Sequence, residues 1–193
     1  GIRLLDVDPG KATNRTVVTL VGSPDDAIEA VFRGIQKAAE VIDMRNHTGE
    51  HPRMGATDVC PLIPISGISM EETAVYAQKL AKRVAEELHI PTYLYEYAQP
   101  NQERNNLSVI RAGEYEGFFE KIKIPAWAPD YGPAEMNPTA GATVIGARDF
   151  LIAYNVNLNT KSPRIANRIA FDVREAGRVQ REGNPYSGEI MND

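Results

Sequence analysis

Cysteine is almost absent from this chain, since Cys60 is the one cysteine among 193 residues. An internal disulfide and a cysteine-based zinc site are therefore excluded, and a reducing compartment is favoured. Apolar runs are far shorter than the roughly 20 residues that span a bilayer, and the first residues show no signal-peptide pattern. We therefore predict a cytoplasmic protein that does not enter a membrane.

Basic residues are also scarce. The 21 Lys and Arg are outnumbered by 26 Asp and Glu, which gives a net charge of −5. A nucleic-acid-binding protein needs a basic stripe, and no dense Lys/Arg run exists here, so nucleic acid is not an expected partner. The apolar content of 42% is that of a globular protein. A chain of this length can form one domain or two small ones with a proper core.

Hydrophobic periodicity predicts the element order ββαβαβαβα. Strands are expected over residues 2–7, 15–21, 58–65, 92–97 and 150–158, and helices over residues 23–42, 69–88, 108–122 and 162–177. The first strand is expected to be buried, with a turn at residues 8–10. Pro61 and Pro64 indicate that residues 58–65 form an edge strand. A long loop is predicted over residues 123–141, and a loop or frayed end over residues 178–193.

One motif in the loop at residues 45–57 matches a known metal pattern. Residues 47–51 read HTGEH, the H-x-x-E-H spacing of inverted zinc peptidases. That spacing brings two imidazoles to one metal when the segment is helical, but Gly49 and Pro52 oppose a helix. Three hypotheses remain open for these histidines: metal ligands, solvated surface groups, or an acid/base catalyst.

An acid/base histidine needs a partner that fixes its tautomer. Asp8 and Glu50 are the carboxylate candidates.

Residues 141–148 resemble a phosphate loop but lack its Lys-Ser/Thr ending, so their glycines indicate a bulge or a close backbone approach. Trp127 and Tyr131 either stack on a flat ring or anchor their loop on the core.

Longer motifs, in order along the chain, are similar to one enzyme family. They are LLDVD at residues 4–8, TNRTV at 13–17, HPRMGATDVCP at 51–61, AEEL at 85–88, YLY at 93–95, IRAGEYE at 110–116, WAPDYGP at 127–133, GAT at 141–143, GAR at 146–148 and FLIAYNVNL at 150–158. From residue 4 to about 176 the chain resembles glutamate formimidoyltransferase, the transferase domain of formimidoyltransferase-cyclodeaminase.

This resemblance implies an α+β fold, with a mixed β-sheet and helices in two layers related to the ferredoxin-like arrangement. Residues 1–148 would form an N-terminal subdomain without the family's first strand and helix. Residues 149–193 would begin a C-terminal subdomain, and folate would bind in the groove between the two. Self-association into a homo-oligomer is also expected.

The implied reaction moves a formimino group from N-formimidoyl-L-glutamate to N5 of tetrahydrofolate and releases glutamate, as in histidine degradation and one-carbon metabolism. Tetrahydrofolate would be a co-substrate, and no metal would be needed. His51 corresponds to the family's catalytic histidine, and we expect Asp8 to orient it. Arg15, Arg53 and Arg148 are candidates for binding substrate carboxylates.

The resemblance places the folate-binding segment at ten consecutive residues. These are Gly132, Pro133, Ala134, Glu135, Met136, Asn137, Pro138, Thr139, Ala140 and Gly141. Three alternatives stay open: a folate-binding module without turnover, a transferase that takes a formyl group from the glutamate derivative, and a metal-dependent hydrolase that uses His47, Glu50 and His51.

Overall fold

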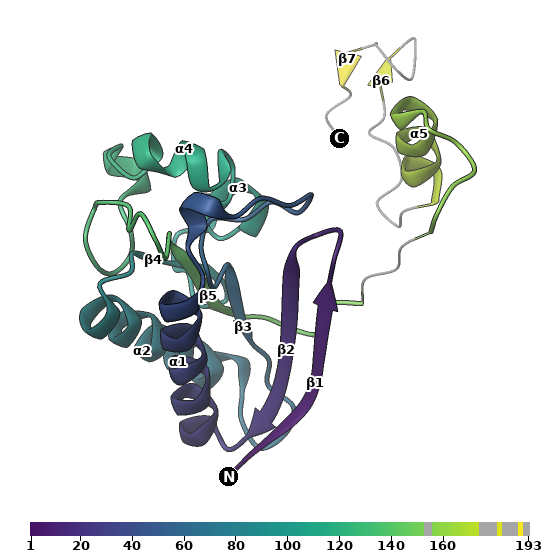
Figure 1. Ribbon diagram of the computed structural model, residues 1–193. Coiled ribbons are helices and arrows are strands. Elements are labelled where there is room, and N and C mark those ends of the chain that lie inside the picture. The colour runs from purple at the N-terminus through teal and green to yellow at the C-terminus, as the bar shows by residue number, and fades with distance from the viewer. Residues whose placement is uncertain (153–155, 174–180, 183–188, 191–193) are drawn as a thin grey trace. The chain divides into compact units, whose positions relative to one another are not determined.

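The structure is a computed structural model that describes residues 1–152, 156–173, 181–182 and 189–190. The chain divides into two compact units, Gly1–Phe150 and Leu151–Asp193 (Figure 1). The first unit contains β1 (Ile2–Gly10), β2 (Arg15–Gly22), α1 (Pro24–Val41), β3 (Val59–Leu62), α2 (Met70–Leu88), β4 (Thr92–Glu96), α3 (Leu107–Ile110), α4 (Glu114–Lys121) and β5 (Thr143–Ala147). The second contains α5 (Pro163–Val173) and the antiparallel pair of β6 (Arg181–Glu182) and β7 (Glu189–Ile190).

The α+β class is confirmed, and a parallel three-stranded sheet in the order β3-β5-β4 forms its centre. β3 lies at an edge, as its prolines predicted. Ser69 and Glu72 form the expected capping box at the start of α2. Gly146 on β5 packs against Tyr95, because an added Cβ would lie 2.3 Å from the tyrosine ring. The glycine therefore permits the close approach that the sequence indicated.

β4 and β5 are buried on both faces except at Glu96, as expected for strands of a parallel sheet that is covered on both sides, and β3 is partly buried. Leu94 and Ile145 pack against α1 and α2, whereas Tyr93 and Val144 pack with residues of α4, including Phe118. Figure 1 shows α1 and α2 together, away from α3 and α4. Helices therefore cover both faces of this sheet.

The hairpin of β1 and β2 differs from its prediction. Its strands pair antiparallel in a sheet of their own, and Leu4 and Val18 are each more than half exposed, so the first strand is not buried. The predicted turn at residues 8–10 is also wrong, because β1 continues through Pro9 and Gly10. Asn14, with φ of 47°, makes the turn instead. Asparagine tolerates this left-handed conformation better than most residues do.

Other boundaries also differ from the sequence prediction. The helix expected over residues 108–122 breaks into α3 and α4, because Gly113 and Glu114 have φ of 95° and 53°. The strand expected at residues 150–158 is absent from 150–152 and 156–158, and 153–155 lie outside the described residues. The sequence prediction missed β5, the centre of the sheet, and also missed β6 and β7.

The C-terminal predictions are covered in part. The described part of the helix expected at residues 162–177 is α5, and residues 174–180 lie outside the described residues. Of the loop expected at 178–193, the structure describes β6 and β7. None of the described helices combines the length and the apolar composition that a membrane crossing requires.

Candidate active site

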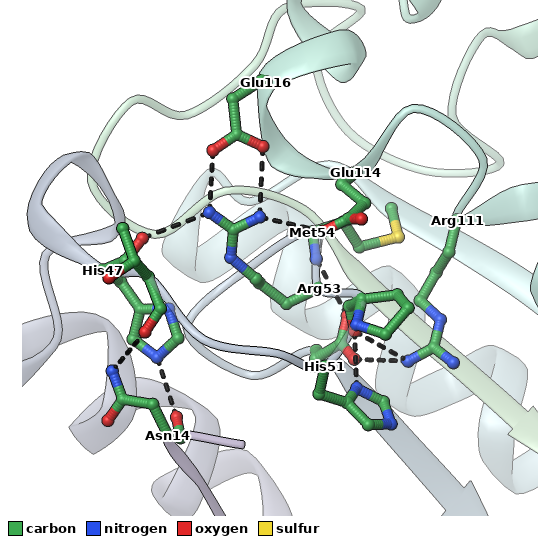
Figure 2. Close-up of polar contacts among 11 residues, drawn as sticks. Asn14, His47, His51, Arg53, Met54, Arg111, Glu114 and Glu116 are labelled. Atoms are coloured by element: carbon green, nitrogen blue, oxygen red, sulfur yellow. Dashed lines mark hydrogen bonds and ion pairs between the residues drawn. The ribbon is translucent and has the colours of Figure 1, made fainter. Parts of the chain in front are cut away.

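The loop at residues 47–58, called the histidine loop below, joins α1 to β3 and carries His47 and His51, which the sequence analysis selected. It follows a short 3-10 turn (Met44–Asn46), and residues 47–51 are not helical. The turn of the β1–β2 hairpin contacts one end of the loop, where the Asn14 side chain donates to the Thr48 carbonyl over 2.7 Å. The break between α3 and α4 contacts the other end (Figure 2). Two segments distant in sequence thus hold the loop, one at each end.

The hydrogen bonds of His51 define its tautomer. Nδ1 lies 2.7 Å from the carbonyl oxygen of Pro52, which can only accept, so Nδ1 carries the proton (Figure 2). Nε2 lies 2.6 Å from Nη1 of Arg15, which can only donate. Nε2 is therefore the unprotonated nitrogen, and this partly exposed ring presents a base on the side of the hairpin.

Asp8 lies on the same face of the hairpin as Arg15. Asp8 is paired with Val17, and Gly10 with Arg15, in an unbroken stretch of antiparallel register. Alternate residues of a strand share a face, so the carboxylate of Asp8 and the guanidinium of Arg15 project to the same side. The described partners of the His51 ring are Pro52 and Arg15. The expected fixing of the tautomer thus comes from a backbone carbonyl rather than from direct contact with Asp8.

His47 has its own partners. Its Nε2 lies 2.8 Å from the carbonyl oxygen of Asn14, and its carbonyl accepts from Arg53 over 3.1 Å (Figure 2). The helix that H-x-x-E-H requires is not formed. Within the described residues, no group of three His, Cys, Asp or Glu side chains is placed to hold a metal ion.

Arg53 forms ion pairs within the protein. Its Nη1 lies 2.9 Å from Glu114, its Nη2 lies 2.7 Å from Glu116, and its side chain is only 12% exposed (Figure 2). Hydrogen bonding to Glu116 is the main reason that the pKa of Arg53 is raised, and Arg53 in turn lowers the pKa of Glu116. The backbone carbonyl of Arg53 also accepts from Tyr115 N over 2.8 Å. Arg53 thus fastens the histidine loop to α4.

The segment expected to bind folate lies directly on this loop. Gly55 and Gly141 form an antiparallel bridge, Ala56 N donates to the Ala140 carbonyl over 2.8 Å, and Ala142 N donates to the Met54 carbonyl over 3.0 Å. The structure therefore brings together the two segments that the resemblance assigned to catalysis and to folate, about 80 residues apart in the chain.

Within residues 132–141, side chains differ in accessibility. Met136 and Ala140 are 4% and 3% exposed and belong to the core. The Asn137 carboxamide oxygen accepts from the backbone of Thr139 and Ala140 and stabilises the turn. A depression of about 330 Å³ borders this turn, and its walls include Gln36 and Glu40 of α1, Glu87 of α2 and Ile90, which follows α2. The exposed residues at 132–135 remain available for contacts.

Arg148, the third predicted carboxylate-binding residue, follows the end of β5. Its backbone N donates to the Leu62 carbonyl over 3.1 Å, and its Nη1 donates to the Asp149 carbonyl over 2.9 Å. These contacts do not connect it with the histidine loop. Arg111, Asp58, Glu114 and Glu116 were missed as site residues, although IRAGEYE and HPRMGATDVCP contain them.

Comparison with known proteins identifies the family of this chain. Residues 1–148 match the family described as "Formiminotransferase domain, N-terminal subdomain". The chain belongs to this family. The match includes the histidine loop, the hairpin and the segment that crosses the loop, so the formiminotransferase N-terminal subdomain holds all three.

Named relatives extend the similarity beyond residue 148. The chain is 52% identical over 183 residues to formimidoyltransferase-cyclodeaminase of Dictyostelium discoideum, covering 94% of this chain and 34% of that protein. It is 47% identical over 177 residues to glutamate formimidoyltransferase of Streptococcus pyogenes serotype M1, covering 92% and 59%. For the Thermoplasma acidophilum glutamate formimidoyltransferase the identity is 48% over 175 residues, covering 90% and 57%. The chain thus spans about a third of the first relative and more than half of the other two.

Proposed function

We propose that this chain transfers the formimino group of N-formimidoyl-L-glutamate to N5 of tetrahydrofolate and releases glutamate. One observation carries the proposal: the unprotonated Nε2 of His51 is presented beside Arg15, on a loop that the predicted folate segment crosses. The names of two relatives, glutamate formimidoyltransferase, support the same reaction.

The chemistry requires one proton to move twice. N5 of tetrahydrofolate attacks the formimino carbon, and the new N5–C bond produces a tetrahedral intermediate. Nε2 of His51 takes the proton from N5 and then gives it to the glutamate nitrogen as the C–N bond to glutamate breaks. Nδ1 keeps its proton throughout, because it donates to the Pro52 carbonyl.

Charged groups around Nε2 suit the two ends of the donor substrate. We assign Arg15 to a glutamate carboxylate, since guanidinium matches carboxylate geometry. Asp8, on the same face of the hairpin, supplies a negative charge for the amidine, which is cationic when protonated. Arg53 is already paired with two glutamates, and we assign it to holding the loop. The exposed residues at 132–135 are assigned to tetrahydrofolate.

Other expectations remain predictions. They are the subdomain boundary at residues 148/149, a carboxylate-binding role for Arg148, self-association, a location in the cytoplasm and a reaction without a metal. A chelator tests the last of these. We expect EDTA to leave the rate unchanged, whereas a chelated enzyme that zinc restores would favour the hydrolase hypothesis with His47, Glu50 and His51.

Glutamate release tests the proposal directly. The chain is mixed with formimidoyl-glutamate and tetrahydrofolate, and free glutamate is followed. We expect release that requires both substrates and falls at least ~100-fold in His51→Ala. His89→Asn, at the C-cap of α2, is the control histidine variant and should keep full activity. Near-normal turnover in His51→Ala would contradict the assignment.

The same assay separates the alternatives. Saturable folate binding without glutamate release would favour a binding module, and preference for formyl-glutamate would identify the other donor. A longer chain, closer in size to the Streptococcus relative, provides a further comparison. If only that longer chain released glutamate, the added segments would contain further substrate-binding groups.

A further inference from the structure

The side chain of Arg111 binds the histidine loop at the Pro52 carbonyl, which also accepts the hydrogen bond from His51. Nη1 of Arg111 donates to the Pro52 carbonyl over 3.3 Å, and Nδ1 of His51 donates to the same oxygen over 2.7 Å (Figure 2). A carbonyl oxygen has two lone pairs and can accept both bonds. The orientation of one peptide group therefore links the guanidinium to the imidazole.

Asp58 holds Arg111 in this position. Its Oδ2 lies 2.6 Å from the same Nη1, and its Oδ1 accepts from Met54 N over 2.9 Å. The side chains of Arg111 and Asp58 are 16% and 15% exposed, so solvent screens the pair less than a surface ion pair. One carboxylate thus binds both the arginine and the backbone that follows Pro52.

The helix break explains why Arg111 reaches the loop. Arg111 is the C-cap of α3, and the left-handed residues Gly113 and Glu114 start α4 in a new direction. Lys121 stabilises the break by donating to the carbonyls of Val109, Ile110 and Ala112. A continuous helix would not contain the change of direction at Gly113 and Glu114 that follows Arg111.

We propose that Arg111, held by Asp58, is a positioning residue that keeps the His51 ring in the tautomer with its proton on Nδ1. The proposal rests on the proposed function, in which Nε2 must be the unprotonated nitrogen that takes the proton from N5. Arg15 contacts Nε2 from the exposed hairpin, whereas Arg111 acts from the protein side through Pro52. Arg111 therefore contributes to turnover without touching the substrate.

The ring nitrogens of ¹⁵N-labelled histidine report this arrangement without any assay of activity. The spectrum is recorded at pH 8, where imidazole is ordinarily neutral, and His51→Gln identifies the His51 signals. We expect the wild-type chain to show a protonated Nδ1 and an unprotonated Nε2 for His51. In Arg111→Met, both signals should move toward intermediate positions, because the two tautomers then exchange.

Turnover provides the second measurement. Arg111→Met should lower kcat by roughly 10- to 100-fold while KM for each substrate changes less than about 3-fold, since a misplaced base affects the transition state more than binding. Arg111→Lys keeps a positive donor near Pro52 and Asp58 and should restore most of the nitrogen pattern and of kcat. Asp58→Asn should resemble Arg111→Met and provides a second test if that variant does not fold.

Arg104→Met is the matched control. Arg104 is similarly buried, at 18% exposed, pairs with Asp130, and donates to the Ala128 carbonyl over 2.9 Å. It should lower the thermal midpoint much as Arg111→Met does, yet leave the His51 signals and kcat unchanged. Unaltered His51 signals in a folded Arg111→Met chain would overturn the proposal. Full turnover in His51→Gln would instead overturn the proposed function, while the nitrogen signals would still report whether Arg111 sets the tautomer.

Discussion

Gly55 and Gly141 pair where the histidine loop crosses the predicted folate segment, and neither has room for a side chain. A Cβ on Gly55 would lie 2.2 Å from the Ala142 carbonyl oxygen, and one on Gly141 would lie 2.2 Å from the Met54 carbonyl oxygen. Gly141 also has φ of 72°, which other residues rarely adopt. This crossing holds the two parts of the site in register.

Gly141→Ala should therefore lower the free energy of unfolding by about 2–3 kcal/mol, through steric overlap and backbone strain. Urea denaturation measures the loss. Gly117→Ala in α4 is the control, because its added Cβ would have no neighbour within 4 Å, and it should stabilise the chain by ~0.5–1 kcal/mol. Equal stability of Gly141→Ala and the unchanged chain would mean that the crossing can open without cost.

The sequence predicted the local elements better than their surroundings. Helices with strong start signals, such as the capping box at Ser69, were located correctly because those signals lie within one turn. The central strand β5 was missed, because its glycines resembled a phosphate loop and Gly146 is explained only by Tyr95 on another strand. The exposure of the first strand likewise depends on what packs against it.

The candidate site shows the same limit. His51 could be selected from its motif, and its proximity to Arg15 and to the crossing at Gly141 follows from chain topology. The roles of Arg53 and Arg111 could not be predicted, because their partners lie more than 50 residues away in sequence. An arginine paired within the protein and one that binds substrate look alike until those partners are known.

Cys60 provides a probe of the β3 edge. It is 7% exposed, and burial raises the pKa of its thiol to about 12. Keeping this thiol neutral contributes to the stability of the folded state, and the contribution is complete below the ordinary cysteine pKa of about 8.5. The contribution is lost as the pH rises from there toward about 12. We expect a thiol reagent at pH 8 to label the native chain very slowly and the urea-unfolded chain completely.

A cysteine at an exposed position calibrates this labelling. Val41, the last residue of α1, is 64% exposed. In a Cys60→Ala background, Val41→Cys should react rapidly under native conditions. If native Cys60 reacted as fast as this control, the edge strand would be opening on the timescale of the reaction.

Asp8 tests whether the hairpin takes part in turnover. Asp8→Asn removes the charge while keeping the shape, and we expect the rate of glutamate release to fall roughly 10- to 100-fold, less than for His51→Ala. Asp6→Asn is the control, because Asp6 lies on the same face of β1, two residues farther from the turn. Equal rates for the two variants would remove Asp8 from the site.

Acid should weaken the attachment of the histidine loop to α4. Hydrogen bonding from Arg53 lowers the pKa of Glu116 in the folded chain, so the ion pair stabilises the fold above the unfolded value of about 4.3. Its contribution is lost as the pH falls through the lower folded value. Urea denaturation between about pH 5 and pH 3 should therefore show a smaller loss of stability in Glu116→Gln than in the unchanged chain. Glu120→Gln, at an 81% exposed carboxylate on the same helix, should retain the full acid-dependent loss. A Glu116→Gln chain that weakens with acid as much as the Glu120→Gln chain would show that the ion pair between Arg53 and Glu116 does not contribute to stability.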